Sequence, residues 1–297
     1  MNMKVDLCGV TLNNPVMTAS GTFGSGAEYA EFVDLNKLGA VVTKGVANVP
    51  WPGNPTPRVA EVYGGMLNAV GLQNPGIDLF VERDIPFLKQ FDTKIMVNVC
   101  GHSTEEYIEV VERLRDQPVD LLEINISCPN VKEGGIAFGQ DPKAVEAITK
   151  EMKKHAAQPV IMKLSPNVTD ITEMARAAEA GGADGLSLIN TITGMKIDIN
   201  RQKFVLANKT GGMSGPAIHP VAVRMVYQTA QAVSIPIVGM GGIMNAEDAI
   251  EMILAGATAV SVGTANFTNP HVTEEIVAGI RDYMERYQVC LLYTSPS

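Results

Sequence analysis

The chain has 297 residues, of which 46% are hydrophobic, and a formal net charge of −9. The apolar content is enough for a sizeable core, and no run approaches the roughly 20 apolar residues that a membrane span needs. The acidic balance, without any basic cluster, argues against nucleic acid or an anionic membrane surface as the partner.

The first predicted elements are two short strands, Lys4–Leu7 and Val10–Leu12, interrupted by Gly9, which form a hairpin at the bottom of the fold. Eight further apolar runs follow, rich in Val, Ile and Leu without polar alternation, as expected for strands buried on both faces. We predict these strands at Val16–Thr18, Ala40–Thr43, Ile95–Val99, Leu121–Ile126, Val160–Leu164, Gly185–Ile189, Ile235–Gly239 and Ala259–Gly263.

Amphipathic stretches between the apolar runs predict helices. Asp170–Ala180 begins with an Asp N-cap, and Asn245–Ala255 begins with an Asn N-cap and ends before Gly256. Thr104–Arg115 and Glu274–Tyr287 show the same helical periodicity of apolar residues.

Eight strands that alternate with helices predict a single α/β domain over residues 1–288, a (β/α)8 TIM barrel with an N-terminal β-hairpin cap and long top-face loops. A doubly wound sheet is the main alternative, but its usual G-x-G-x-x-G motif is absent. The two long loops, Val46–Pro86 and Thr191–Pro220, are expected to carry function. Residues 289–297 have no charge and no periodicity, and we expect a non-native or unstructured tail there.

Four cysteines are present, and none forms a C-x-x-C pair, so zinc or iron–sulfur ligation within this chain is not expected and we predict no metal site. They are Cys8, Cys100, Cys128 and Cys290. Free thiols, together with the absence of a signal-peptide core in Met1–Leu7, predict a cytoplasmic protein.

Cys128 stands out among these thiols. It lies within Asn125–Asn130, directly after a predicted strand, and the flexible pair Gly134-Gly135 follows it. A thiol at the C-terminal end of a barrel strand, under a hinged loop, suits an acid–base or nucleophilic cysteine. A buried structural cysteine is the alternative interpretation.

Gly-rich turns follow the seventh and eighth strands, at Gly239–Ile243 and Gly263–Ala265. Loops after these two strands of a barrel often bind phosphate, because backbone N–H groups converge there. A third turn, Gly212–Gly215, precedes the helix after the sixth strand and can add donors.

Two lysines, Lys44 and Lys163, lie at strand ends, and a lysine buried there needs an anionic partner. Amides add polar groups at other strand ends and loops: Asn68, Asn98, Asn125, Asn130 and Asn190. This combination of cations, amides, a thiol and phosphate-binding turns is suited to binding a flat, polar, anionic heterocycle beside a phosphorylated cofactor. It does not fit glycoside hydrolysis or divalent-metal chemistry.

An ordered set of motifs from residue 1 to about 287 carries a resemblance to a known family. The motifs are Ser20-Gly21-Thr22-Phe23-Gly24, Thr43-Lys44-Gly45, Asn68-Ala69-Val70-Gly71-Leu72-Gln73-Asn74, Asn125 to Asn130, Lys163 to Asn167, Ile189-Asn190-Thr191 and the three Gly turns. With them the chain resembles class 1 dihydroorotate dehydrogenases, which are FMN flavoproteins. The segments Asn68–Gly76 and Ser20–Gly24 resemble the B-type subclass, whose catalytic FMN subunit works with a partner subunit that carries FAD and an iron–sulfur cluster.

The resemblance implies oxidation of dihydroorotate to orotate in de novo pyrimidine (UMP) biosynthesis, with Cys128 as the base, hydride transfer to FMN, and electrons passed to NAD through the partner. It also implies a homodimer core within a heterotetramer. The implied substrate-binding residues are Lys44, Asn68, Ala69, Val70, Gly71, Leu72, Asn125, Asn130, Asn190 and Thr191. The implied FMN-binding residues are Ser20, Lys44, Gly45, Asn98, Asn125, Lys163, Ile189, Gly215, Gly241, Gly242, Gly263 and Thr264.

Three alternatives differ in how the flavin is used. A fumarate-dependent class 1A enzyme would need no partner. A tRNA dihydrouridine synthase-like flavin reductase also uses FMN and a Cys, but the acidic charge argues against it. A non-catalytic electron-relay subunit would leave Cys128 and the asparagines without a role.

Overall fold

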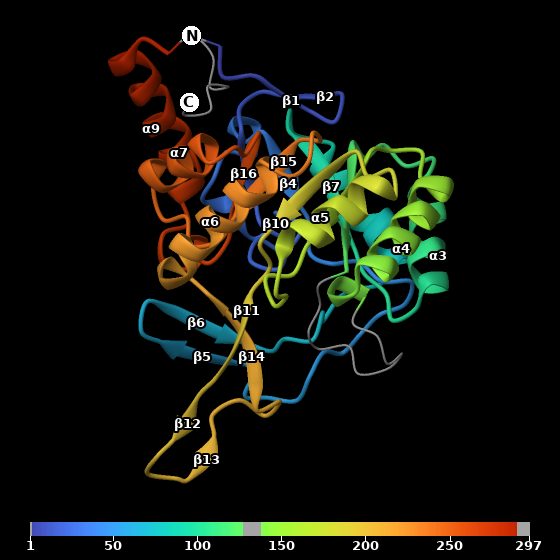
Figure 1. Ribbon diagram of the computed structural model, residues 1–297, viewed down its shortest axis with the longest axis vertical. Helices are drawn as coiled ribbons and strands as arrows, with labels where there is room; N and C mark the ends of the chain where they lie inside the picture. The colour runs from blue at the N-terminus through green and yellow to red at the C-terminus, as the bar shows by residue number, and fades with distance from the viewer. Residues whose placement is uncertain (1, 127–137, 290–297) are drawn as a thin grey trace.

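The computed structural model describes residues 2–126 and 138–289. Eight parallel strands close a barrel in the order β10-β15-β16-β3-β4-β7-β8-β9, which confirms the predicted TIM barrel (Figure 1). The barrel strands are β3 (Val16–Thr18), β4 (Ala40–Val42), β7 (Lys94–Val99), β8 (Leu121–Asn125), β9 (Val160–Lys163), β10 (Gly185–Leu188), β15 (Ile237–Met240) and β16 (Ala259–Val262).

Almost every barrel-strand residue is buried, which explains the missing polar alternation in the sequence. Most predicted bounds agree with the observed strands within a residue. β15 differs most, because it begins at Ile237 and not at Ile235. Pro236 has no N–H to donate to a neighbouring strand, so the ladder starts after it.

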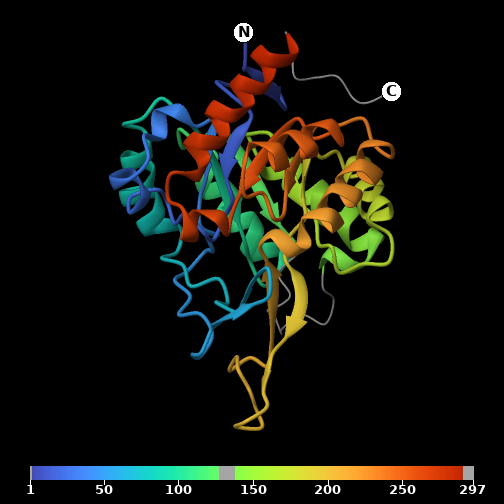
Figure 2. The same cartoon turned by 90° about the vertical axis from the view of Figure 1, so that its left-hand side faces the viewer.

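Helices surround the barrel (Figures 1 and 2). They are α1 (Ile77–Leu79), α2 (Ile85–Leu88), α3 (Thr104–Leu114), α4 (Pro142–His155), α5 (Ile171–Ala180), α6 (His219–Ala230), α7 (Ala246–Leu254), α8 (Ala265–Thr268) and α9 (Val272–Tyr287). Both predicted N-caps are confirmed: Asp170 accepts from Thr172 N at 2.8 Å, and Asn245 accepts from Asp248 N at 3.0 Å. Across the two described ranges, every helix is too short or too polar to span a bilayer.

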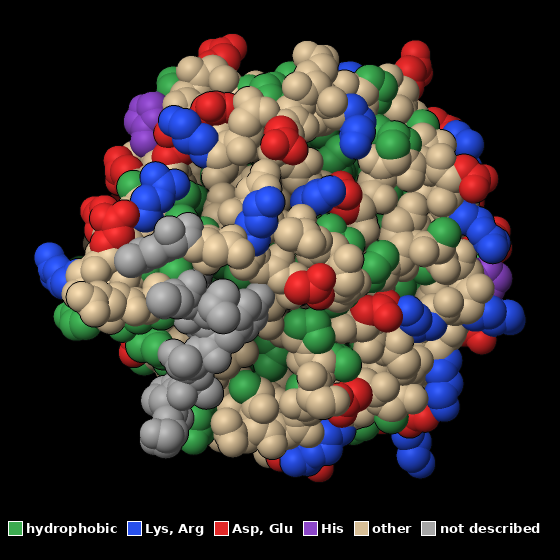
Figure 3. Space-filling model, turned by 90° about the horizontal axis from the view of Figure 1, so that it is seen from above, with side chains coloured by type: hydrophobic (Ala, Val, Ile, Leu, Met, Phe, Trp, Pro, Cys, Tyr) green, Lys and Arg blue, Asp and Glu red, His purple; other side chains and the backbone are tan. Residues whose placement is uncertain are grey.

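The predicted hairpin is confirmed as β1 (Val5–Leu7) paired antiparallel with β2 (Val10–Leu12). Val5, Leu7 and Leu12 pack against residues at the starts of the barrel strands, including Met96 and Leu121, so the hairpin closes the bottom of the barrel. In Figure 3, which views this end of the molecule from above, Lys and Arg side chains are interspersed with Asp and Glu over the described residues.

The two long segments expected to be loops contain strands. β5 (Val59–Val62), β6 (Gly65–Asn68), β11 (Ile192–Met195) and β14 (Thr210–Ser214) form an antiparallel sheet in the order β11-β14-β6-β5. It lies at the end of the barrel opposite the hairpin, and β12 (Ile197–Asp198) and β13 (Lys203–Phe204) extend beyond it (Figure 1). The expected turn at Gly212–Gly215 was wrong in part, because Gly212 to Ser214 belong to β14.

The loop after β3 is held by Phe23. Its side chain is fully buried and its ring stacks on Tyr29 with centroids 4.2 Å apart. Phe23→Ala should lower the free energy of unfolding by about 3–5 kcal/mol, because it opens a cavity in the core. Phe32→Ala, at a site 53% exposed, is the matched control and should change stability by less than about 0.5 kcal/mol. Urea denaturation followed by circular dichroism measures both, and equal losses would contradict this account of the loop.

Candidate active site

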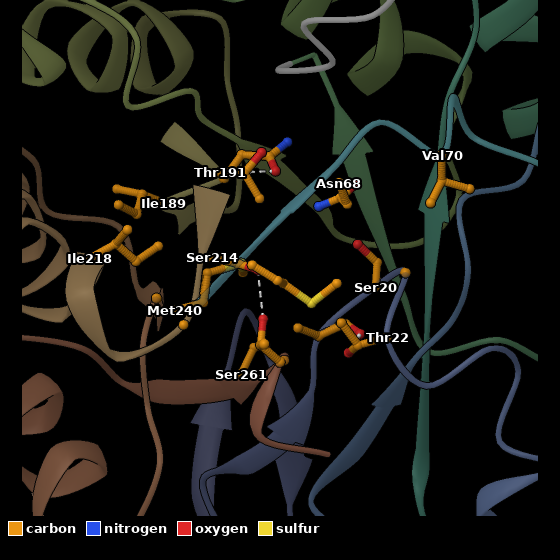
Figure 4. A pocket seen from close by; sticks show the side chains of 18 of the residues that line it. Ser20, Thr22, Asn68, Val70, Ile189, Thr191, Ser214, Ile218, Met240 and Ser261 are labelled. Carbon is orange, nitrogen blue, oxygen red and sulfur yellow. Dashed lines mark hydrogen bonds between the residues drawn. The ribbon is translucent and has the colours of Figure 1, made fainter. Parts of the chain in front are cut away.

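A cavity opens at the C-terminal ends of the barrel strands, beside the antiparallel sheet. In Figure 4, Asn68 and Val70 reach it from the segment around β6, while Ile218 and Met240 reach it from the opposite wall. Barrel topology brings the ends of all eight strands to this one face, which is why loops distant in sequence meet here.

The cavity brings together nearly all of the site residues implied by the resemblance. Those lining it are Ser20, Lys44, Gly45, Asn68, Val70, Gly71, Leu72, Asn98, Asn125, Lys163, Ile189, Asn190, Thr191, Gly215, Gly241, Gly242, Gly263 and Thr264. Ala69 does not line it, because its side chain is buried with Leu67 and Leu206 in a small separate core. Cys128 and Asn130 lie outside the described residues.

Lys163 places a cation at the base of the cavity. Only 4% of its side chain is exposed, and its Nζ donates to Ser20 Oγ at 3.0 Å. Glu123, on the neighbouring strand β8, lies 3.4 Å away and is the anionic partner that a buried lysine requires. Glu123 was not among the predicted site residues, although one acidic residue in the apolar run of β8 was a signal for it.

Three asparagine side chains extend from Glu123 toward the cavity. Asn98 Nδ2 donates to Glu123 Oε2 at 2.6 Å. Asn125 Nδ2 donates to Asn98 Oδ1 and Asn190 Nδ2 donates to Asn125 Oδ1, both at 3.5 Å. The Tyr107 hydroxyl fixes the backbone of this region from outside the barrel, because it donates to the Asn125 carbonyl oxygen at 2.6 Å.

Backbone in the left-handed region shapes the segment that follows β6. Gly71 has φ 75°, and a Cβ there would lie 2.6 Å from Asn54 Cγ. Leu72 has φ 55°, a conformation that costs a non-glycine residue of order 1 kcal/mol and is concentrated at functional sites. Asn54 supports the segment, since its Nδ2 donates to the Ala69 carbonyl at 3.0 Å.

Two glycines at the far end of the cavity are required by packing. Gly241 has φ 130°, and a Cβ there would lie 2.7 Å from Ala222 Cβ in the first turn of α6. A Cβ at Gly242, with φ 69°, would lie 2.8 Å from the Gly215 carbonyl oxygen. The same Cβ would lie 2.9 Å from the backbone N of His219, at the start of α6, where no side chain caps the helix, so a backbone N–H lies beside this turn.

Gly263 differs from these two glycines. Its φ is ordinary, and a Cβ there would make only a van der Waals contact of 3.4 Å with Ala19 Cβ beside the cavity. Next to it, Thr264 Oγ1 donates to Ser214 Oγ at 2.7 Å, which places two hydroxyls at the same end of the cavity. The missing side chain at Gly263 therefore leaves space in the cavity and not in the core.

Ser261 was missed by the sequence reasoning. It lines the cavity, only 2% of it is exposed, and its Oγ has no hydrogen-bond partner in the described part of the chain. A buried hydroxyl costs free energy unless it is paired, so this orphaned group fits a polar ligand in the cavity. Its signal was a serine in the otherwise apolar run of β16. Thr22 and Ile218 also line the cavity and were not predicted as site residues, while Ser214 and Met240 line it and were predicted only as parts of the Gly turns.

The described thiols do not resemble a catalytic base. Burial, followed by the charges of Asp184 and Asp6, raises the pKa of the Cys8 thiol to about 12, and Cys8 Sγ donates to the Asp184 carbonyl at 3.3 Å. Cys100 is buried. Among residues 2–126 and 138–289, no group of three or more His, Cys, Asp or Glu is arranged to hold a metal ion.

Comparisons with known proteins agree with this architecture. The family model described as dihydroorotate dehydrogenase matches residues 2–284. A protein of Lachnoclostridium phytofermentans named "Dihydroorotate dehydrogenase B (NAD(+)), catalytic subunit" is 72% identical, over 97% of this chain and 96% of its own. A protein of Alkaliphilus metalliredigens with the same name is 66% identical, with the same coverage.

A solved structure is also similar in fold. The crystal structure of the enzyme abbreviated DHODH from Eimeria tenella, in complex with ferulenol, superposes with a TM-score of 0.82 at 22% identity. The match covers 98% of this chain and 87% of the other. At this identity the likeness supports the fold alone.

Proposed function

This chain belongs to the dihydroorotate dehydrogenase family, and we propose that it is the catalytic FMN subunit of a B-type enzyme that oxidises dihydroorotate to orotate in pyrimidine biosynthesis. The observation that carries the proposal is the single cavity lined by both lysines and by Asn68, Asn98 and Asn125. High identity over nearly the whole chain to relatives named as catalytic subunits supports the same assignment.

The cavity fits FMN. The hydroxyls of Thr264 and Ser214, the turn at Gly241-Gly242 and the uncapped start of α6 would hold the phosphate, and the unpaired Ser261 hydroxyl faces the same cavity. Lys163 and the amides would hold the ring at the other end. When bound, FMN supplies a hydride acceptor that no amino-acid side chain provides. Residues 1–288 would then form one FMN-binding domain.

The chain's own residues would bind the substrate and move one proton. Lys44 would pair with the substrate carboxylate, and Asn68, Asn125 and Asn190 would bind the ring through its carbonyl and N–H groups. Cys128, as thiolate, would remove the proton from the carbon beside the ring carbonyl, while a hydride leaves the neighbouring carbon for FMN. One proton and one hydride are lost, so a carbon–carbon double bond forms and orotate results.

The cofactor placement can be tested at Gly263, where the fold does not require glycine. Gly263→Val should fold normally but bind FMN about 1–3 kcal/mol more weakly, because the added methyl groups occupy the cavity. The FMN affinity of Gly263→Ala should lie between those of Gly263→Val and the wild type. Thermal melting checks the fold, and flavin absorbance of the purified proteins measures FMN content. Wild-type FMN content in a folded Gly263→Val would rule out this placement.

The role of Cys128 can be tested by removing the thiol. Cys128→Ala should retain FMN but reduce it with dihydroorotate about 10²–10⁴-fold more slowly, since that is the usual contribution of a positioned base. Cys8→Ala is the matched control and should react at the wild-type rate, because that thiol lies at the barrel bottom. Stopped-flow measurement of flavin reduction decides, and a Cys128→Ala rate within about threefold of wild type would refute the assignment.

We further propose a partner subunit with FAD and an iron–sulfur cluster, which passes the electrons to NAD. The chain has neither C-x-x-C nor G-x-G-x-x-G, so it lacks the usual means to do this alone. Val59 and Phe267 line the cavity and are 51% and 53% exposed, which supports docking of a protein near this rim.

A homodimer core within a heterotetramer is part of the same proposal. At the end of β11 and beyond the antiparallel sheet, on the protruding segment around β12 and β13, large apolar side chains are exposed, as at protein–protein interfaces: Met195, Ile197, Ile199 and Phe204. We also propose a cytoplasmic location, in which thiols such as Cys100 remain reduced.

Electron exit separates the B-type from the A-type proposal. The isolated chain should have its FMN reduced by dihydroorotate in a single turnover and reoxidised by ferricyanide, but should produce no NADH. Addition of a subunit with FAD and an iron–sulfur cluster should restore NADH formation, which absorbance measures. Sustained NADH production by the chain alone would refute the need for a partner. Rapid turnover with fumarate would instead favour the A-type enzyme.

A further inference from the structure

Glu123 is a buried carboxylate beneath the cavity that does not itself line it. The residue has 0% relative exposure, and each of its oxygens has a donor. Ser187 Oγ donates to Oε1 at 2.7 Å, while Asn98 Nδ2 at 2.6 Å and Lys163 Nζ at 3.4 Å approach Oε2. A buried carboxylate requires hydrogen-bond donors to both of its oxygens, and here they come from strands β7, β9 and β10 of the barrel.

Glu123 fixes the direction of the asparagine hydrogen bonds. A carboxylate only accepts hydrogen bonds, so Asn98 must turn its NH2 group toward Glu123 and its carbonyl oxygen away. That oxygen accepts from Asn125 Nδ2, and Asn125 Oδ1 accepts from Asn190 Nδ2. All three amides are therefore ordered in one sense, with each donating toward Glu123.

Glu123 also compensates the charge of Lys163. The lysine lines the cavity, but its side chain is almost fully buried, and its polar contacts with side chains at the cavity base are Ser20 and Glu123. Together the ammonium and the carboxylate have no net charge. A ligand above them therefore meets an oriented pair of charges and not a lone cation.

We propose that Glu123 is a positioning residue that acts through Lys163 and Asn98 to set the redox potential of bound FMN. The inference rests on the proposed function. Uptake of a hydride adds negative charge to the cofactor, which the Lys163 ammonium stabilises and the Glu123 carboxylate opposes. Removal of the carboxylate charge at constant shape should therefore favour the reduced cofactor.

The test uses the purified, flavin-loaded chain and its Glu123→Gln variant. The variant keeps the size of the side chain and removes its charge. The equilibrium constant for two-electron reduction should rise at least about tenfold, which is about 30 mV toward positive potential. Equilibration with reference dyes of known potential measures this shift.

Ser187→Ala is the matched control. It removes one buried hydrogen bond from Glu123 and leaves the charge in place, and among the described hydrogen bonds the Ser187 hydroxyl contacts neither the Lys163 ammonium nor the Asn98 amide. Its reduction constant should change less than about threefold. If Glu123 were only structural, both variants would loosen the same cluster and shift alike. Equal shifts in the two variants, or an unchanged potential in flavin-loaded Glu123→Gln, would overturn this inference but leave the proposed function intact.

A second variant covers the case in which Glu123→Gln does not fold. Loss of folding is the result expected when a buried lysine loses its anionic partner, so Glu123→Gln with Lys163→Met should restore the melting temperature. The double variant should then have a potential below that of wild type, since no ammonium remains. Failure of either result would overturn the inference. A wild-type chain that retains no flavin would overturn the proposed function together with it.

Discussion

The register among four neighbouring barrel strands controls the chemistry of this site. Asn98 on β7 lies opposite Glu123 on β8, Asn125 lies opposite Lys163 on β9, and Lys163 lies opposite Ser187 on β10. Because side chains alternate between the two faces of a strand, a shift by one residue would turn each of these groups out toward the helices. Towards the bottom of the barrel the interior is apolar, with Met96, Leu121 and Ile161 packed there, so the polar cluster and the register depend on each other.

The sequence predicted most of the barrel because its signals were local. Apolar runs, N-caps such as Asp170 and the Gly turns each depend on a few neighbouring residues. The cavity residues were carried by motifs at strand ends, and the structure places all but Ala69, among those described, around one space. Glu123 was not predicted as a site residue, because the direction of a strand side chain, into the barrel or out toward the helices, depends on the register, which no local pattern determines.

The antiparallel sheet was missed for a different physical reason. β14 contains Gly211 and Gly212, which have low strand propensity, and it pairs with β6 at a separation of 144 positions between Gly212 and Asn68. Pairing over such a distance depends on the finished barrel and leaves little trace in the local sequence. The glycine turns show a related effect. Gly241 and Gly242 are required by contacts with α6, which only the assembled fold reveals.

The long separation between β6 and β14 also affects how the molecule comes together. Four of the eight barrel strands, β7, β8, β9 and β10, lie between them in the chain, so closing this contact directly from the unfolded chain would cost considerable loop entropy. The barrel itself closes over a still longer distance in the chain, between Val16 on β3 and Val260 on β16. Once β7 to β10 are paired in the barrel, β6 and β14 are held near each other, so the sheet can form at little further entropy cost. Asn68 belongs to the sheet and Lys163 to the barrel, so the two walls of one cavity come from parts of the chain that must both be assembled before the cavity exists.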